Sequence, residues 1–214
     1  MIKFVIVLLV VVCQQGKSEF SSKLQLAVYY ESKCPDSSRF ITQQLVPALN
    51  RLQDYLDLTL IPFGKASSIN NGDSGFQCQH GPSECLGNLV QDCALYYMQG
   101  RKDVEKANYV ACEMQTFYGT TKNLRCVESA GLPVHLIQQC VSSNDGKELQ
   151  LISEYATKLI SPKFVPTVTI NHEFNQQIQD YAQVDLLGTL CSLLKDAQPC
   201  ASHYNRQALH DVLF

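Results

Sequence analysis

No cluster of lysine or arginine stands out in this 214-residue sequence, in which 20 acidic side chains outnumber 17 basic ones. A protein that binds DNA or RNA neutralises phosphates with a basic face. The sequence has no segment that would form such a face. We therefore expect no nucleic-acid partner.

The sequence also has no apolar run of about 20 residues, the length that a membrane-spanning helix needs. One shorter run, residues 4–13, follows Lys3 and precedes the small residues Gly16 and Ser18. This arrangement is typical of a secretory signal peptide. It predicts a signal peptide over residues 1–18, cleaved near Ser18, one domain over residues 19–214, and no membrane span.

A second cysteine is missing where a redox motif would have one. In YYESKCPDSSRFI, residues 29–41, Cys34 is followed by Pro35 and, three positions on, by Ser37. Proline suits the first position of a helix, so the Cys34 sulfur is expected at a helix N-terminus, where free amides favour a thiolate. The alternative is a small buried apolar side chain. Ser37 cannot resolve a mixed disulfide as a second thiol would.

The other cysteines are plentiful, and their number is odd. Of the ten, Cys13 lies in the predicted signal peptide, which leaves nine. A secreted chain is expected to bridge its cysteines, so at least one thiol stays free or pairs with another molecule, and Cys34 is the candidate. The eight cysteines expected in disulfides are Cys78, Cys85, Cys93, Cys112, Cys126, Cys140, Cys191 and Cys200. Only Cys191 with Cys200 is predicted as a specific pair, because a last helix and a short return loop would bring them together.

Hydrophobic periodicity predicts a mixed α/β chain. The pattern predicts strands over residues 24–30, 58–61 and 164–170, and helices over residues 41–56, with a kink at Pro47, 148–160 and 184–194. A loop and a cysteine-rich helical stretch occupy about residues 64–147. The order of elements therefore indicates a strand–helix–strand start and a strand–helix end, separated by a disulfide-rich helical insertion.

The segment CQHGPSECLGNLVQDC, residues 78–93, has zinc-ligand residue types without zinc-ligand spacing. No two of its cysteines have the two-to-four-residue gap of a zinc knuckle. We expect these cysteines to form disulfides, His80 to be a structural hydrogen-bonding residue, and no metal site. Further along, Pro166 is either an edge-strand proline or a cis-proline beside the cysteine helix.

Together these segments resemble the gamma-interferon-inducible lysosomal thiol reductase (GILT) family. The family signature, C-Q-H-G-x-x-E-C-x-x-N-x-x-x-x-C, is met by Cys78, Gln79, His80, Gly81, Glu84, Cys85, Asn88 and Cys93. The resemblance implies a thioredoxin-like fold and an ancestral activity that reduces protein disulfides at acidic pH. It also implies that Cys34 is the attacking cysteine and Pro166 the substrate-facing cis-proline. Ser37 departs from the resolving cysteine of the family.

Two functions stay open at this stage. The first is a secreted GILT-like protein that has lost dithiol turnover and binds other proteins; the second is a monothiol oxidoreductase that uses Cys34 with an external thiol such as glutathione. No other cofactor is expected, and the protein is either a monomer or a Cys34-linked dimer. Lysosomal members of the family are delivered through N-linked sugars. No asparagine of this sequence has serine or threonine two residues on, so secretion is expected, with a lysosomal or endosomal location as the alternative.

Overall fold

The computed structural model describes residues 23–201, so the predicted signal peptide lies outside the described residues. The strands are β1 (Leu24–Tyr30), β2 (Leu56–Pro62), β3 (Ser67–Ser68), β4 (Phe76–Gln77) and β5 (Thr167–Ile170). The α-helices are α1 (Pro35–Phe40), α2 (Val46–Leu52), α3 (Pro82–Tyr97), α4 (Asp103–Thr116), α5 (Arg125–Ser129), α6 (Val134–Ser142), α7 (Asn144–Ile160) and α8 (Gln176–Leu193). The shorter helical turns are η1 (Ile41–Leu45), η2 (Gln53–Tyr55) and η3 (Tyr118–Thr121). None of the described helices is long and apolar enough to cross a membrane.

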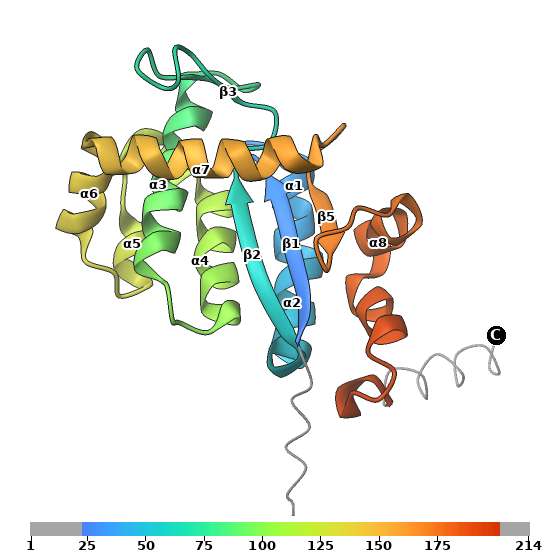
Figure 1. Ribbon diagram of the computed structural model, residues 1–214. Helices are drawn as coiled ribbons and strands as arrows, with labels where there is room; N and C mark the ends of the chain where they lie inside the picture. The colour runs from blue at the N-terminus through green and yellow to red at the C-terminus, as the bar shows by residue number, and fades with distance from the viewer. Residues whose placement is uncertain (1–22, 202–214) are drawn as a thin grey trace, which may run out of the picture.

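Three strands form the central sheet, in the order β2-β1-β5. Strands β1 and β2 run parallel, with Leu24 opposite Leu56 and Tyr30 opposite Pro62. Strand β5 is antiparallel to β1, with Val28 opposite Val168. Both parallel strands therefore end at the same edge of the sheet, at the top of Figure 1, where the chain after β1 leads directly into Cys34.

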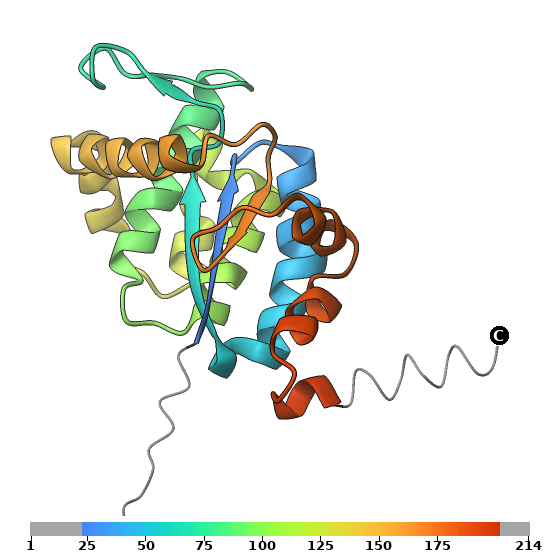
Figure 2. The ribbon, with the colours of Figure 1, turned by 45° about the vertical axis from the view of Figure 1, so that its right-hand side comes forward.

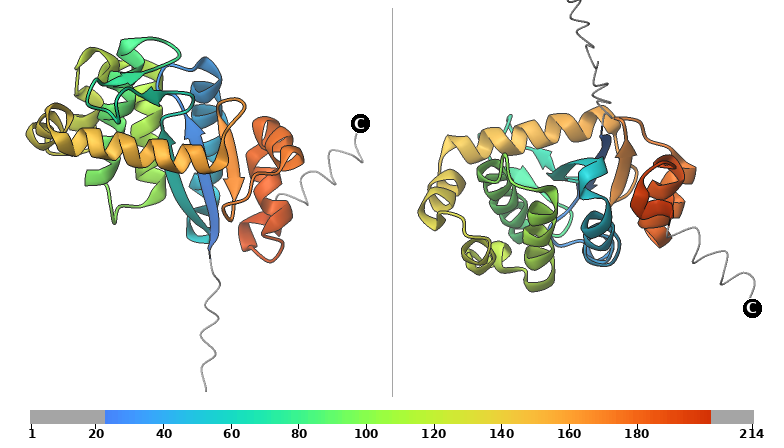
Figure 3. Two further views of the ribbon diagram at one scale, coloured as in Figure 1. Left: turned by 45° about the horizontal axis from the view of Figure 1, so that its top comes forward. Right: turned by 90° about the horizontal axis from the view of Figure 1, so that it is seen from below.

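The two faces of the sheet are covered by different helices. Alternate side chains of β1, Leu26, Val28 and Tyr30, are buried in the main core together with residues of α1 and α2. On the other face Tyr29 packs with Ile61 and Phe63 against α7. Seen from below, α7 and the α1–α2 helices lie on opposite sides of the strands (Figure 3). Helix α8 lies beside β5 and the α1–α2 helices (Figure 2).

The first helix begins where the Cys34–Pro35 segment predicted. Pro35 is its first residue, so the apolar pattern of residues 41–56 covers only its later part, and the expected kink at Pro47 is replaced by the π-helical turn η1 just before that proline. In this turn the Val46 N–H donates to the Ile41 carbonyl. Pro47 then falls in the first turn of α2, directly after this π-helical turn.

Several other boundaries also differ from the sequence pattern. Helix α7 begins at Asn144, inside the predicted insertion, because the Ser143 side chain accepts the Asp145 N–H at 3.2 Å and caps the helix. Strand β5 begins at Thr167 because Pro166 stands immediately before it. The loop after β2 contains the two-residue hairpin strands β3 and β4.

The last helix is longer than predicted. Helix α8 begins at Gln176, eight residues before the predicted start at residue 184. The Asn175 side chain caps it by accepting the Ile178 N–H at 3.1 Å. Its first half is glutamine-rich, which hides the short apolar spacing from Ile178 to Ala182. The backbone leaves helical geometry at Asp185, near the predicted start.

Four disulfides cross-link the described residues. Cys93–Cys140 joins α3 to α6, Cys112–Cys126 joins α4 to α5, and Cys78–Cys85 ties the segment before α3 to its first turn. Cys191 and Cys200, the pair expected from the sequence, are also bonded. Three of the four bridges thus lie within the helical stretch between β2 and β5.

Candidate active site

Cys34 occupies the N-cap position of α1, and Pro35 is the first residue of the helix. Its backbone is extended, with φ −71° and ψ 121°, and its carbonyl accepts the first helical bond from the Ser38 N–H at 3.0 Å. The side chain is 7% exposed. Cys34 is the free cysteine among residues 23–201, so the thiol of the site is a single sulfur at the start of a helix.

Ser37 lies one helical turn after Cys34 and is fully buried. Its hydroxyl has no hydrogen-bond partner among the described residues. The eight other cysteines of residues 23–201 are all in disulfides. Within the described chain, no second thiol is therefore available to resolve a mixed disulfide on Cys34.

The loop before β5 lies next to the Cys34 sulfur. The Val165–Pro166 peptide bond is cis, and the Val165 carbonyl oxygen is 3.9 Å from the Cys34 Sγ. A buried glutamine of α8 braces this loop, since the Gln179 amide donates to the Pro166 carbonyl at 3.0 Å and accepts the Val168 N–H at 2.8 Å. Of the two alternatives for Pro166, the structure has the cis-proline beside the cysteine helix.

The signature segment holds the backbone that leads to Cys34. The Asn88 side chain accepts the Ser32 N–H at 2.9 Å, and the Glu84 carbonyl accepts the Ser32 hydroxyl at 3.0 Å. Helix α3 approaches so closely that a Cβ at Gly87 would lie 2.5 Å from the Ser32 Oγ. Lys33 adds a contact from its ammonium to the Ser83 hydroxyl at 3.0 Å. The first half of α3 therefore holds Ser32 and Lys33, the two residues directly before Cys34.

The remaining signature residues shape the entry to α3. Cys78 and Cys85 form a disulfide, and Gly81 is the N-cap of the helix. Cys93, at the end of the signature, is bonded to Cys140. Gln79 is exposed. The signature is thus a structural unit around the start of α3, and its cysteines are not free to bind a metal.

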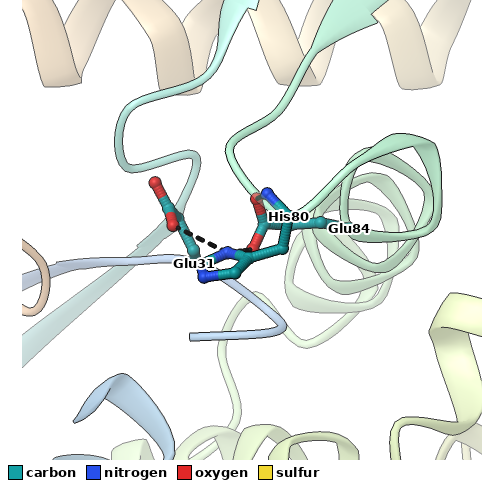
Figure 4. A group of neighbouring side chains, drawn as sticks. All are labelled: Glu31, His80 and Glu84. Atoms are coloured by element: carbon teal, nitrogen blue, oxygen red, sulfur yellow. Dashed lines mark hydrogen bonds and ion pairs between the residues drawn. The ribbon is translucent and has the colours of Figure 1, made fainter. Parts of the chain in front are cut away.

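Two signature residues, His80 and Glu84, form a carboxylate–imidazole group with Glu31 (Figure 4). The His80 Nδ1 is 2.5 Å from the Glu84 Oε2 and 3.3 Å from the Glu31 Oε2. Both glutamates are fully buried, whereas the His80 side chain is 31% exposed. His80 was expected to be a structural hydrogen-bonding residue. Its ring Nδ1 forms a hydrogen bond with the Glu84 Oε2, and its backbone N–H donates to the Glu84 Oε1 at 3.0 Å.

Glu31 is the residue of this group that sequence reasoning missed. Burial raises the pKa of its carboxyl; the Lys65 N–H, which it accepts at 2.7 Å, lowers the pKa, the nearby Glu84 raises it, and His80 lowers it. The only signal in the sequence was a charged residue directly after a buried strand and three positions before Cys34.

Comparison with known proteins places the chain in a family. A model of the family described as gamma interferon inducible lysosomal thiol reductase (GILT) matches residues 25–130. GILT-like protein 1 of Drosophila melanogaster is 32% identical over 219 residues, covering 94% of this chain and 88% of that protein. The gamma-interferon-inducible lysosomal thiol reductase-like protein of Anopheles gambiae is 36% identical over 187 residues, covering 81% and 78%. The chain belongs to the GILT family.

A solved structure supports the predicted fold of this GILT-family chain. The oxidoreductase DsbA from Xylella fastidiosa matches with a TM-score of 0.54 and 10% sequence identity, over 82% of this chain and 88% of that chain. At this identity the likeness shows the fold alone. The predicted thioredoxin-like α/β fold with disulfide-bonded helices is confirmed. Family and fold together make the chain a thiol-disulfide oxidoreductase-like protein.

Proposed function

We propose that this GILT-family protein has lost dithiol reductase turnover and acts by binding other proteins. The observation that carries the proposal is the absence of a second free thiol in residues 23–201. Ser37 stands in the place of the resolving cysteine, and the other cysteines of that range are bridged. The half of the site that attacks is retained, and the half that releases the product is replaced.

The chemistry of such a site follows from thiol–disulfide exchange. The Cys34 thiolate attacks one sulfur of a partner disulfide, a bond forms between Cys34 and that sulfur, and the other sulfur leaves as a thiolate that takes up a proton. In a dithiol enzyme a second thiolate then attacks the Cys34 sulfur. The Ser37 hydroxyl forms no disulfide, so the partner stays attached.

An exposed apolar surface supports the protein-binding part of the proposal. Ile152, Tyr155 and Leu159 follow one another at helical spacing on α7 and are 63%, 66% and 68% exposed. An apolar stripe of this kind on the outside of a domain is typical of a protein interaction surface. We further propose that the protein is secreted, with a lysosomal or endosomal location as the alternative, and that it is a monomer because the Cys34 sulfur is buried.

The second candidate function is a monothiol oxidoreductase, favoured by the cis-proline loop beside Cys34. In this cycle an external thiol such as glutathione attacks the Cys34 sulfur of the mixed disulfide and releases the reduced partner. A second glutathione thiolate attacks the glutathione sulfur on Cys34, which gives oxidised glutathione and returns the Cys34 thiolate. Overall, one partner disulfide is reduced and two glutathione molecules are oxidised.

Insulin reduction distinguishes the two functions. We would measure the rate for the parent protein, Ser37→Cys and Cys34→Ala at acidic and neutral pH, with and without glutathione. For the binding protein we expect turnover by Ser37→Cys and none by the parent. Turnover by the parent that requires glutathione and is lost in Cys34→Ala would instead establish the monothiol enzyme. Each turnover takes its electrons from glutathione, so none is expected without it, and glutathione-dependent turnover by the parent that persists in Cys34→Ala would contradict both.

A further inference from the structure

The carboxylate–imidazole group of Glu31, His80 and Glu84 has a chemistry that the thiol site does not use. We propose that it binds a divalent transition-metal ion such as Zn²⁺ through the Glu31 Oε2, the His80 Nδ1 and the Glu84 Oε2. Mixed imidazole and carboxylate ligands are a common zinc donor set, and three protein ligands leave a fourth position open. No metal site was expected from the sequence, because no two cysteines of residues 78–93 have zinc-knuckle spacing, and in the structure these cysteines are bridged. The proposed ligand set uses none of them.

The distances suit a small tetrahedral ion. The three ligand atoms lie within 4.8 Å of one another. Ligands bound to zinc at 2.0–2.1 Å in a tetrahedron are about 3.3 Å apart, which matches the 3.3 Å between the His80 Nδ1 and the Glu31 Oε2. The 2.5 Å contact to Glu84 must widen. His80 is the member that can move, because its side chain is partly exposed while both glutamates are buried.

An unpartnered buried atom points to a missing ligand. The Glu31 Oε2 has no hydrogen bond among the described residues, although Glu31 is fully buried and this oxygen faces the His80 ring. The single proton that Nδ1 can carry serves the closer Glu84. Two buried carboxylates thus share one imidazole. The nearby lysines do not fill the gap with their ammonium groups, since Lys65 contacts Glu31 through its backbone and the Lys33 ammonium bonds to Ser83.

The surrounding backbone already orients both carboxylates. The Lys65 N–H holds the Glu31 Oε1 at 2.7 Å, and the His80 N–H holds the Glu84 Oε1 at 3.0 Å. Each glutamate is therefore held through its Oε1 and turns its Oε2 toward the His80 Nδ1, and hydrogen bonds that orient ligands in this way are the second shell that metal sites use. Gly64 packs directly on Glu31, where an added Cβ would lie 2.3 Å from the Glu31 Cγ. The Glu31 side chain is thus fixed in one position.

A bound ion would tie the site to the redox segment. The Glu31 carbonyl accepts the Cys34 N–H at 3.2 Å, so Glu31 belongs to the turn that presents the cysteine. His80 lies within the loop closed by the Cys78–Cys85 disulfide. The ion would join the turn, this loop and α3 at one point.

Calorimetric titration with zinc chloride tests the proposal. We would use the mature chain carrying Cys34→Ala, because a free thiol itself binds zinc, after dialysis against a chelator at neutral pH. We expect one ion per chain, and affinity at least about tenfold weaker in Glu31→Gln and in Glu84→Gln. Zinc should also raise the melting temperature of the parent and not that of either variant. Affinity should fall at acidic pH, because a protonated histidine cannot ligate.

Control variants separate this site from three of the four other histidines. Glu173→Gln with His172→Asn, and separately His203→Gln with His210→Gln, remove exposed or tail side chains and should leave the affinity unchanged. The proposal is overturned if the Cys34→Ala protein shows no saturable binding, if both glutamine variants bind like the parent, or if a control pair abolishes binding. Should a glutamine variant not fold, anomalous scattering at the zinc edge from crystals of the Cys34→Ala protein decides the question. A peak among the three ligand atoms supports the site, and its absence there overturns it.

Discussion

The Ser37 hydroxyl is buried without a hydrogen-bond partner among the described residues, whereas a second buried serine of the same site is fully bonded. The Ser32 Oγ donates to the Glu84 carbonyl, and both serines are 0% exposed. A buried hydroxyl without a partner costs about 1–3 kcal/mol, and a buried hydrogen bond contributes about 1 kcal/mol. Ser37 and Ser32 therefore allow a buried hydroxyl without a partner to be compared with a buried hydroxyl that is hydrogen-bonded.

We predict opposite effects of Ser37→Ala and Ser32→Ala on the free energy of unfolding. Ser37→Ala should leave it unchanged or raise it by about 1 kcal/mol, because only an unpaired group is removed. Ser32→Ala should lower it by about 1 kcal/mol. Urea denaturation of both variants measures the difference. A clear loss in Ser37→Ala would mean that the hydroxyl has a partner, such as a bound water, that sustains it.

The residues of the thiol site were predictable because a local pattern marks each of them. A cysteine before proline at a helix start, a serine one turn on, and a proline opening a strand are visible without knowing the fold. Glu31 was not predictable in this way. Its partners His80 and Glu84 come from another segment, and a single carboxylate after a strand has no motif that would connect it to them.

At the scale of elements, α8 controls the cis-proline loop through one side chain. The buried Gln179 amide satisfies the Pro166 carbonyl and the Val168 N–H together. Replacing it leaves two buried backbone groups without partners, at a cost of about 1–3 kcal/mol each. The cis-proline loop would then lose both hydrogen bonds to α8.

We predict that Gln179→Leu lowers the free energy of unfolding by about 2–6 kcal/mol and changes the alkylation rate of Cys34. The matched control is Gln177→Leu, an exposed glutamine of the same helix, which should alter neither quantity. Urea denaturation and the rate of iodoacetamide labelling provide the two measurements. Equal behaviour of the two variants would show that Gln179 does not brace the loop.

The disulfides offer a second prediction at this scale. Cys93–Cys140 spans 47 residues and Cys78–Cys85 spans 7. Loop-closure entropy then predicts losses of about 4 and about 2 kcal/mol when each pair is replaced by alanine. Removal of Cys78–Cys85 should have the larger effect on Cys34 labelling, because that bridge is in the first turn of the helix that holds Ser32 and Lys33. Chemical denaturation of the two double variants checks the order, and a larger loss from the short loop would contradict it.

Element boundaries were the least predictable feature, for local physical reasons. The π-helical turn before Pro47 depends on one hydrogen bond from Val46 that no periodicity reveals. The glutamine-rich first half of α8 gave no clear apolar stripe, although Gln179 there is buried by its bonds to the backbone of the cis-proline loop. In contrast, β1 and the helix after Cys34 had strong patterns and were found.

For the whole molecule, the contact between α3 and α7 contains a buried acid that makes stability depend on pH. Asp92 of α3 accepts hydrogen bonds from the Gln150 amide and from the Ser153 hydroxyl at 2.9 Å, both on α7. Burial raises the pKa of Asp92 from 3.8 to about 8, against the lowering effect of these two bonds. Burial also raises the pKa values of Glu31 and Glu113, whereas the pKa of Glu154 beside Lys158 is lowered.

The sign of the effect follows from proton binding. Between pH 3.8 and about pH 8 the folded protein keeps a proton on Asp92 that the unfolded chain releases. Asp92 therefore contributes its full stabilisation below pH 3.8, and this contribution is lost as the pH rises to about 8. The slope is at most about 1.4 kcal/mol per pH unit for one group. The raised pKa values of Glu31 and Glu113 act in the same direction, so the fold should be most stable in acid.

We predict that the free energy of unfolding falls from pH 5 to pH 8 and that Asp92→Asn flattens this dependence. Asparagine retains hydrogen-bonding capacity toward Gln150 and Ser153 but binds no proton in this range. The matched control is Asp73→Asn, which removes an exposed carboxylate paired with Lys147 and should leave the slope as it is. Urea denaturation at several pH values provides the curves. An unchanged slope in Asp92→Asn would contradict the assignment to Asp92, and a parent protein most stable at neutral pH would contradict the predicted direction.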